Sequence, residues 1–273
     1  MARALGIPVA TLRSWNQRYG LGPPHHDPGK HRYYTPGDVA VLGRMVDLVR
    51  AGVSPAAAAK AARSAAQPTP ALGDTSPARA AADRLDAAEL LAIVSAHIAH
   101  FGVVSTWNQL CRPVYADIVD RQSHALGLVE VEHVLSWAVT TALHRAVPPI
   151  RYTAGRAPVL LACTAGESHV LPLEVLRAAA AEAGIPALLL GASLPAGALA
   201  AAIARQPREP VVVLWSQTER TASPAPIPAG SRAPAGLLLA GPGWRTTDVF
   251  PGAVRVDSLE DALGRIVRTV HSY

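Results

Sequence analysis

Residues 158–170 read PVLLACTAGESHV, an unbroken apolar run followed by a polar turn. Five consecutive apolar residues, Val159–Cys163, are typical of a strand that is buried on both faces of a parallel sheet. Runs of the same kind recur through the C-terminal half of the chain, which predicts a whole sheet. They are Ala187–Leu190, Val211–Trp215, Leu237–Ala240 and the shorter Val254–Val256.

Helical stretches separate these strands. Leu173–Ala183 and Ala196–Arg205 lie between the first three strands, and Leu259–Val270 closes the chain. This alternation predicts a doubly wound, flavodoxin-like parallel sheet across residues 151–273. One unit is irregular, because four prolines fall between residues 218 and 235, where a crossover helix would be expected. We therefore expect a loop there.

The segment before the sheet carries apolar residues at helical spacing. Leu90, Ile93, Val94 and Ile98 recur at helical spacing, and similar patterns continue as far as Val147 without a strong strand signal. Residues 78–150 are therefore predicted to form a four-helix bundle. Residues 67–77 are rich in Pro, Thr, Ser and Gly and are expected to form a linker.

Residues 1–66 are predicted to form a small helical head. A helix over Val9–Arg18 would place Leu12 and Trp15 on one buried face. Further helices are expected to start at Thr35-Pro36 and at Ser54-Pro55, because Ser or Thr is a favoured N-cap and Pro suits the first turn. The expected fold class is thus α plus α/β, with a head, a bundle and a parallel sheet.

Positive charge is concentrated in the head. Residues 1–65 hold nine Lys or Arg and three Asp, a net charge of +6, whereas the whole chain carries +5. A basic head on a near-neutral body is typical of a domain that binds a polyanion such as DNA, although a solvated helix surface has the same pattern. Half of the residues are hydrophobic and 16% are charged, as in a folded protein.

Apolar runs such as Pro158–Cys163 and Gly236–Ala240 are too short to span a bilayer, and no signal peptide is seen. We therefore expect a cytoplasmic protein with no membrane partner. The two cysteines, Cys111 and Cys163, fall in different segments and have no metal-ligand spacing.

Two stretches of the head carry a family resemblance. Residues 6–21 read GIPVATLRSWNQRYGL, and residues 30–38 read KHRYYTPGD. Together they resemble the winged helix-turn-helix of MerR-family transcriptional regulators, which covers residues 1 to about 65 here. The resemblance implies that side chains of the first helix lie at the DNA groove and that side chains of the wing contact phosphates. The groove residues are Thr11, Arg13 and Arg18, and the wing residues are Lys30, Arg32 and Tyr33.

The same resemblance leads to three further expectations. Trp15 and Tyr34 should pack rather than read bases. Asn16 stands where the family usually carries Glu, which predicts the loss of an ion pair within the domain. The chain also begins inside the first helix of the family, so either the start of this sequence is late or the head is N-terminally truncated and less stable.

The turn Gly166-Glu167-Ser168-His169 directly follows the first strand. Ligands bind at the carboxyl ends of strands in open α/β sheets, and a histidine with a nearby carboxylate can be an oriented metal ligand there. A plain surface histidine is the alternative. The turn resembles the Asp/Glu-x-His-x-x-Gly signature of cobalamin-binding domains, although Pro172 replaces its Gly. This resemblance implies that His169 ligates the cobalt of cobalamin and that Glu167 orients it.

Other positions match the same domain family. Gly241-Pro242-Gly243 corresponds to a glycine turn whose missing side chains admit the nucleotide tail of cobalamin. The resemblance implies that the residues lining this tail are Ser193, Leu194, Ser216, Gly241 and Gly243.

The bundle resembles the helical cap of the light-responsive, cobalamin-dependent repressors of carotenoid genes. Glu132-His133 match their Glu-His pair, and Gln122 and Ser123 occupy the places of their Trp and His. The resemblance implies that Gln122, Glu132 and His133 lie at the cofactor. Because of Gln122 and Ser123, it leaves open whether light is sensed.

Three hypotheses follow. In the first, the chain is a repressor that binds a double-stranded DNA operator as a homodimer or tetramer and senses cobalamin, including adenosylcobalamin. In the second, the body no longer binds cobalamin and serves oligomerisation or protein interaction. The third, an enzymatic corrinoid methyl carrier or mutase module, is disfavoured by the DNA-binding head and by the lack of a separate catalytic domain. We therefore expect that the protein is not an enzyme.

Overall fold

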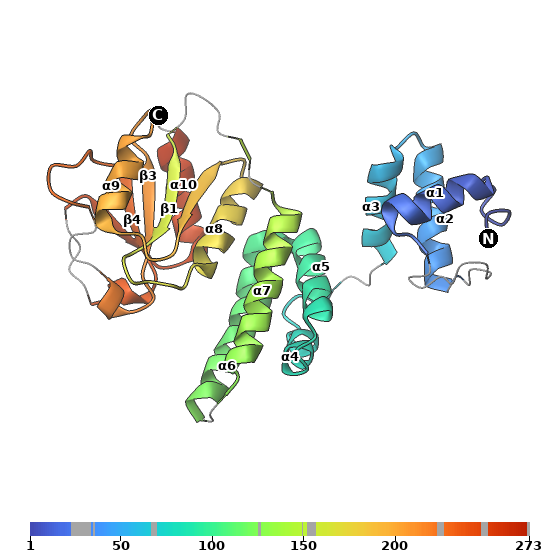
Figure 1. The fold of residues 1–273 in the computed structure, drawn as a ribbon, viewed down its shortest axis with the longest axis horizontal. Coiled ribbons are helices and arrows are strands. Elements are labelled where there is room, and N and C mark those ends of the chain that lie inside the picture. The colour runs from blue at the N-terminus through green and yellow to red at the C-terminus, as the bar shows by residue number, and fades with distance from the viewer. Residues whose placement is uncertain are drawn as a thin grey trace. The chain divides into compact units, whose positions relative to one another are not determined.

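The structure is a computed structural model that describes residues 1–22, 34, 36–66, 70–124, 127–148, 150–151, 157–222, 227–246 and 251–271. The chain divides into two compact units, Met1–Thr69 and Pro70–Tyr273. Figure 1 draws the first unit in blue to cyan and the second in green to red.

The first unit is helical. Its helices are α1 (Val9–Tyr19), α2 (Pro36–Arg50) and α3 (Pro55–Ala66). The helices predicted from the head sequence are therefore confirmed. Their core gathers apolar residues of all three helices, among them Leu12, Met45 and Ala59. Gly20 ends α1 in the left-handed conformation, with a φ of 60°, and its N–H bonds to the carbonyl of Asn16.

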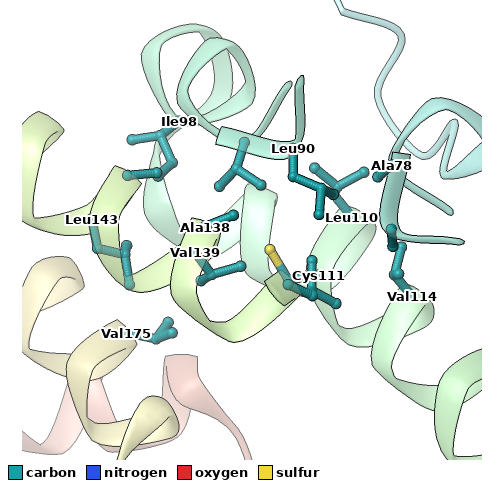
Figure 2. Close-up of a cluster of buried hydrophobic side chains, with 14 of the residues drawn as sticks. Ala78, Leu90, Ile98, Leu110, Cys111, Val114, Ala138, Val139, Leu143 and Val175 are labelled. Atoms are coloured by element: carbon teal, nitrogen blue, oxygen red, sulfur yellow. The ribbon is translucent and has the colours of Figure 1, made fainter. Parts of the chain in front are cut away.

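The second unit begins with a helical bundle. Its elements are α4 (Ser76–Asp83), α5 (Ala87–Thr106), the π-helical turn η1 (Trp107–Cys111), α6 (Arg112–His124) and α7 (Val129–Ala146). Helix α4 starts within the predicted linker. Figure 2 shows how Leu90, Leu110 and Val139 meet in the bundle core. The four α-helices agree with the bundle that the helical spacing predicts.

The helical stretch Ala87–His124, made of α5, η1 and α6, is long and apolar enough to cross a membrane, by length and composition alone. The sequence analysis, which considered only the short strand-like runs, did not anticipate this. Core helices of folded proteins pass the same test, and Leu90, Val94 and Ile98 of this helix are buried in the bundle core.

The rest of the second unit is a five-stranded sheet with the order β2-β1-β3-β4-β5. All neighbouring strands are parallel, and this order is the flavodoxin-like one. The predicted doubly wound sheet is therefore confirmed. The strands are β1 (Val159–Cys163), β2 (Ala187–Gly191), β3 (Val211–Trp215), β4 (Gly236–Ala240) and β5 (Ala253–Val256). The helices are α8 (Leu171–Glu182), α9 (Ala196–Ala204) and α10 (Leu259–His271).

Alternate strand residues pack on opposite faces of the sheet, which helices cover on both sides (Figure 1). Leu161 and Val213 face α8 and α10, whereas Leu160 and Val212 face α9. Among the described residues between β3 and β4 there is only a short 3-10 turn, η2 (Glu219–Thr221), as the prolines predict.

Helix α8 is covered on both sides. Leu176 packs toward the sheet, while Val175 and Ala179 belong to the core of the bundle. Figure 2 shows Val175 reaching the bundle core beside Leu143. The bundle and the sheet therefore share α8 as a common wall, which places α6 and α7 near the carboxyl ends of the strands.

Candidate functional site

A large cavity lies between the bundle and the carboxyl ends of the strands. It has a volume of about 980 Å³, which is at the upper end of the range for ligand pockets. One wall comes from η1, α6 and α7, and the other from the loops after β1, β3 and β4 and the start of α10. The place is where open α/β sheets bind ligands.

Of the residues predicted to hold a cofactor, four line this cavity. They are Glu132, His133, His169 and Gly241. His169 lies in the loop between β1 and α8, and its side chain is 54% exposed. Glu167, in the same loop, is 2% exposed and contacts His169 directly.

Glu167 is held by hydrogen bonds at both carboxylate oxygens. Its Oε1 accepts from the backbone N–H of His169 at 2.9 Å and lies 2.5 Å from His169 Nδ1. Its Oε2 accepts from the backbone N–H of Gln217 at 2.7 Å and from the Thr221 hydroxyl at 2.8 Å. The loop after β3 therefore fixes the carboxylate that contacts the histidine.

These bonds determine the protonation of the pair. Burial alone would raise the pKa of Glu167, but the hydrogen bonds from His169, Gln217 and Thr221 outweigh it and lower the pKa to about 2. An ionised carboxylate can only accept hydrogen bonds, so Nδ1 of His169 carries a proton. In the neutral imidazole, Nε2 then has the lone pair and can ligate a metal.

The residues expected around the nucleotide tail make contacts within the protein. The Ser193 hydroxyl accepts the N–H of Gly166 at 2.9 Å. Ser216 is fully buried, and its hydroxyl donates to the carbonyl of Thr218 at 3.0 Å. Leu194 lines a separate cavity of about 40 Å³. The described residues around the large cavity include neither serine.

The α6 residues expected at the cofactor also make their contacts within the protein. Gln122 does not line the large cavity, but its amide donates to the Glu132 carboxylate at 3.3 Å. The Ser123 hydroxyl bonds to the carbonyl of Asp120, and His124 Nδ1 lies 2.8 Å from the same carbonyl. Both side chains are thus held on the exposed surface of α6.

Several aromatic residues at the cavity were not identified from the sequence. Trp107, Tyr115 and Trp137 line its bundle wall, and the Tyr115 hydroxyl lies 2.8 Å from that of Ser136. Burial raises the pKa of Tyr115, so its hydroxyl stays protonated at neutral pH. The sequence could have identified Trp137, because it lies one helical turn after His133 and therefore shares a helix face with it.

The candidate nucleic-acid surface lies on α1. Leu12 and Trp15 are buried, whereas Arg13 and Arg18 are exposed and Thr11 is half-buried. At about 100° per residue, the two arginines lie about 140° apart around the helix axis and flank its solvent-facing side. The predicted wing residues Lys30, Arg32 and Tyr33 lie outside the described residues. Gln17 and Ser14, which the sequence analysis did not select, lie between the arginines on the exposed side.

Contacts within the head hold α1 in place. Trp15 and Tyr34 both pack in the core, as expected. Asn16 donates to the Tyr34 hydroxyl at 2.8 Å, so a neutral hydrogen bond is present at the position where the family usually carries Glu. Arg63 of α3 donates to the carbonyl of Tyr19 at 2.7 Å, at the end of α1.

Both cysteines are buried, and the Cys163 thiol donates to the backbone carbonyl of His169 at 3.7 Å. Burial raises the pKa of Cys111 and of Cys163 to about 12, so both thiols are protonated at neutral pH. Among the described residues, no three His, Cys, Asp or Glu side chains gather into a metal-binding cluster.

The sequence of the head matches a known family of proteins. Residues 1–65 match the family described as MerR HTH family regulatory protein. Residues 1–65 of the first unit are therefore a MerR-type helix-turn-helix domain. This confirms the resemblance noted in the sequence.

The chain is related to a repressor over most of its length. It is 27% identical over 220 residues to the HTH-type transcriptional repressor CarH of Myxococcus xanthus, covering 74% of this chain and 72% of the relative. A solved structure, the methanol:cobalamin methyltransferase complex MtaBC from Methanosarcina barkeri, covers 98% of this chain and 94% of its own, with 12% identity and a TM-score of 0.38.

Proposed function

We propose that this protein is a cytoplasmic DNA-binding repressor whose second unit binds cobalamin, with His169 as the ligand to cobalt. The observation that carries the proposal is His169 at the wall of the large cavity, with its Nδ1 in contact with the buried Glu167 carboxylate. Relationship to a transcriptional repressor supports the repressor role. We expect the protein to bind its operator as a homodimer or tetramer, as bivalent regulators do.

The cavity fits the ring of a corrinoid in three respects. Its volume is at the upper limit for ligand pockets, and one imidazole suits a metal whose equatorial positions are filled by a macrocycle. Trp215 lines the cavity, and its buried indole N–H has no partner among the described residues, so an acceptor on a ligand would satisfy it.

The residues at and behind the wall have separate roles in this proposal. Glu167 keeps the proton on Nδ1 of His169, so that Nε2 keeps its lone pair and can bind the metal. Trp107, Tyr115 and Trp137 exclude water from the bundle side, and Glu132 supplies a polar contact. When bound, cobalamin would supply a cobalt centre that can exchange a ligand.

Absorption spectroscopy tests the cofactor half of the proposal. The purified protein should form a red complex with adenosylcobalamin in the dark, and illumination of that complex tests whether light is sensed. His169→Ala should change the spectrum and weaken binding, and Glu167→Gln should weaken it by roughly tenfold or more, as for other residues that orient metal ligands. His100→Ala, an exposed histidine on α5, is the matched control. An unchanged spectrum in His169→Ala would remove His169 from the ligand role.

Salt-dependent DNA binding tests the other half. Arg13→Ala and Arg18→Ala should each weaken binding to DNA from the promoter of the protein's own gene and reduce the slope of log K against log salt by about 1 per lost phosphate contact. Arg232→Ala, in the second unit, should leave the slope unchanged. Full affinity in both head variants would contradict a role for α1.

A second candidate function has specific support. The second unit could serve oligomerisation without a cofactor, because Gln122 does not line the cavity and Trp137 and Val119 are exposed at its bundle wall. In that case the protein would stay colourless with adenosylcobalamin and still bind its promoter DNA.

A further inference from the structure

Three side chains that can only donate hydrogen bonds line the large cavity at the ends of β3, β4 and β5. They are Trp215, Arg245 and Arg255, which together are called the donor corner here. We propose that the donor corner binds a phosphate group. Two sources share that chemistry, namely the phosphodiester of cobalamin and a free phosphate ion. For the first source the inference rests on the proposed function, which it deepens by naming a group that the cavity recognises.

The sheet brings these three residues to the same edge. Trp215 ends β3, Arg255 lies one residue before the end of β5, and Arg245 follows the 3-10 turn η3 (Pro242–Trp244) after β4. Strand β4 lies between β3 and β5, and all three run parallel. Adjacent strands are about 4.8 Å apart, so β3 and β5 are separated by about 10 Å. The side chains therefore start from neighbouring positions at one end of the sheet.

The indole of Trp215 lies against the beginning of this turn. A Cβ on Gly241 would come within 3.2 Å of Trp215 Cδ2. The backbone N–H of Arg245 donates to the Pro242 carbonyl at 3.2 Å, at the end of the same turn. The Nε1–H of Trp215 is buried and has no hydrogen-bond partner in the part of the chain that the structure describes. An acceptor is therefore needed beside the turn that also carries Arg245.

The charge of this wall favours an anion. Arg245 is exposed, and no carboxylate of the described residues forms an ion pair with it. Among the described residues of the sheet wall, Asp257 is the one carboxylate at the cavity, and it pairs with neither Arg245 nor Arg255. Two guanidinium groups against one carboxylate leave this wall positively charged. A negative group on a ligand would therefore be attracted to it.

A phosphate suits this set of donors better than a carboxylate does. A guanidinium presents its N–H groups in a planar fork that binds two oxygens of a phosphate at once. The oxygens of a phosphate are arranged as a tetrahedron, so it can accept from groups on different sides. A carboxylate is flat and has two oxygens, which one guanidinium fork already occupies. Donors that come from three strand ends therefore match the tetrahedral group.

Thermal unfolding of the full chain without a corrinoid tests the donor corner directly. Inorganic phosphate should raise the unfolding temperature of the second unit more than sodium chloride of equal ionic strength does, because it binds the folded state. Arg245→Gln should abolish this difference. Arg220→Gln is the matched control, because Arg220 is exposed in the loop after β3 and does not line the cavity. It should keep the full phosphate effect.

Absorption titration with two corrinoids in the dark identifies the source of the phosphate. Hydroxocobalamin carries a phosphodiester, whereas aquacobinamide has none. If the corner binds the phosphodiester, Arg245→Gln should weaken hydroxocobalamin binding by about tenfold and leave aquacobinamide binding within about twofold. If it binds a free ion, Arg245→Gln should change the affinity for neither corrinoid, while the effect of phosphate on wild-type unfolding persists.

The outcomes separate this inference from the proposed function. Arg245→Gln that alters neither the phosphate effect on unfolding nor the affinity ratio of the two corrinoids would overturn the inference. Binding of both corrinoids to the wild type would still support the proposed function in that case. Binding of neither corrinoid to the wild type would contradict the proposed function, and the unfolding measurement alone would then decide whether the corner binds phosphate.

Discussion

At the scale of single residues, a buried carboxylate controls the chemistry of the site. Glu167 accepts four hydrogen bonds from three residues, and these bonds keep it ionised although it is 2% exposed. Its charge fixes the proton on Nδ1 of His169 and leaves Nε2 for a ligand. The pair is thus oriented before any ligand arrives.

The depressed pKa of Glu167 predicts a pH dependence of stability. Its folded-state pKa of about 2 lies below the ordinary value of 4.5, so its stabilisation is fully present above pH 4.5 and is lost as the pH falls through 2. The free energy of unfolding of wild type minus that of Glu167→Gln should therefore shrink over this range. Urea unfolding at several pH values measures it. Glu209→Gln, at an exposed carboxylate, is the control, and a pH-independent difference for Glu167→Gln would contradict the assignment.

The close approach of the loops predicts the effect of an added methyl group. Gly243→Ala should destabilise the second unit by about 1–3 kcal/mol, the usual cost of overpacking, because its Cβ would lie 2.4 Å from the Thr218 carbonyl. Gly197→Ala in α9 is a matched control, because a Cβ there meets no atom within 4 Å. It should be neutral or stabilising by up to about 1 kcal/mol. Chemical denaturation compares the two, and equal stabilities would argue against the tight loop contact.

At the scale of elements, a break in α5 creates a contact between the bundle and helix α8 of the sheet domain. Gly102 has φ 75° and ψ 175°, which breaks the helix and releases the N–H of Val103 from its usual acceptor. The Glu182 carboxylate at the end of α8 accepts that N–H at 3.0 and 3.2 Å. The contact fixes the bundle against α8, and thereby the wall of the cavity.

Removal of this acceptor should loosen the junction. Glu182→Ala should cost roughly 1–2 kcal/mol, because it removes a hydrogen bond to a charged group and leaves a buried N–H without its partner. Urea unfolding gives the free energy, and hydrogen exchange should show faster exchange at Val103. Glu209→Ala, which removes an exposed pair with Arg232, should change stability by less than about 1 kcal/mol. Unchanged exchange at Val103 would show that the carboxylate does not support the break.

At the scale of the whole molecule, the two units have separate apolar cores. The first unit has its own apolar cluster around Leu12 and Met45, and the second has clusters in the bundle and on both faces of the sheet. Each unit therefore has the apolar interior that a domain needs.

Separate cores predict separate responses to ligand. In a thermal or urea unfolding experiment the full chain should show two transitions, and cobalamin at a hundred times its dissociation constant should stabilise only the second unit, by about 2.7 kcal/mol. His169→Ala should abolish that stabilisation, whereas Arg18→Ala should retain it. A single transition that shifts as a whole would contradict the independence of the two units.

Much of this architecture follows from local sequence patterns. The runs Val159–Cys163 and Val211–Trp215 coincide with β1 and β3, because a strand buried on both faces needs consecutive apolar residues. Likewise, α1 follows from the spacing of Leu12 and Trp15. The placement of His169 at a strand end also followed from the sequence, because the end of an apolar run is visible in it.

The sequence by itself determined the elements, their order and the histidine at the end of β1, because these depend on periodicity and on neighbours in the chain. Tertiary structure alone decided what surrounds that histidine. Thr221 reaches Glu167 across 54 positions, and Trp244 packs with Leu214 and Leu239 of two neighbouring strands. Such contacts depend on how distant loops pack at the edge of the sheet, and no local pattern encodes that packing.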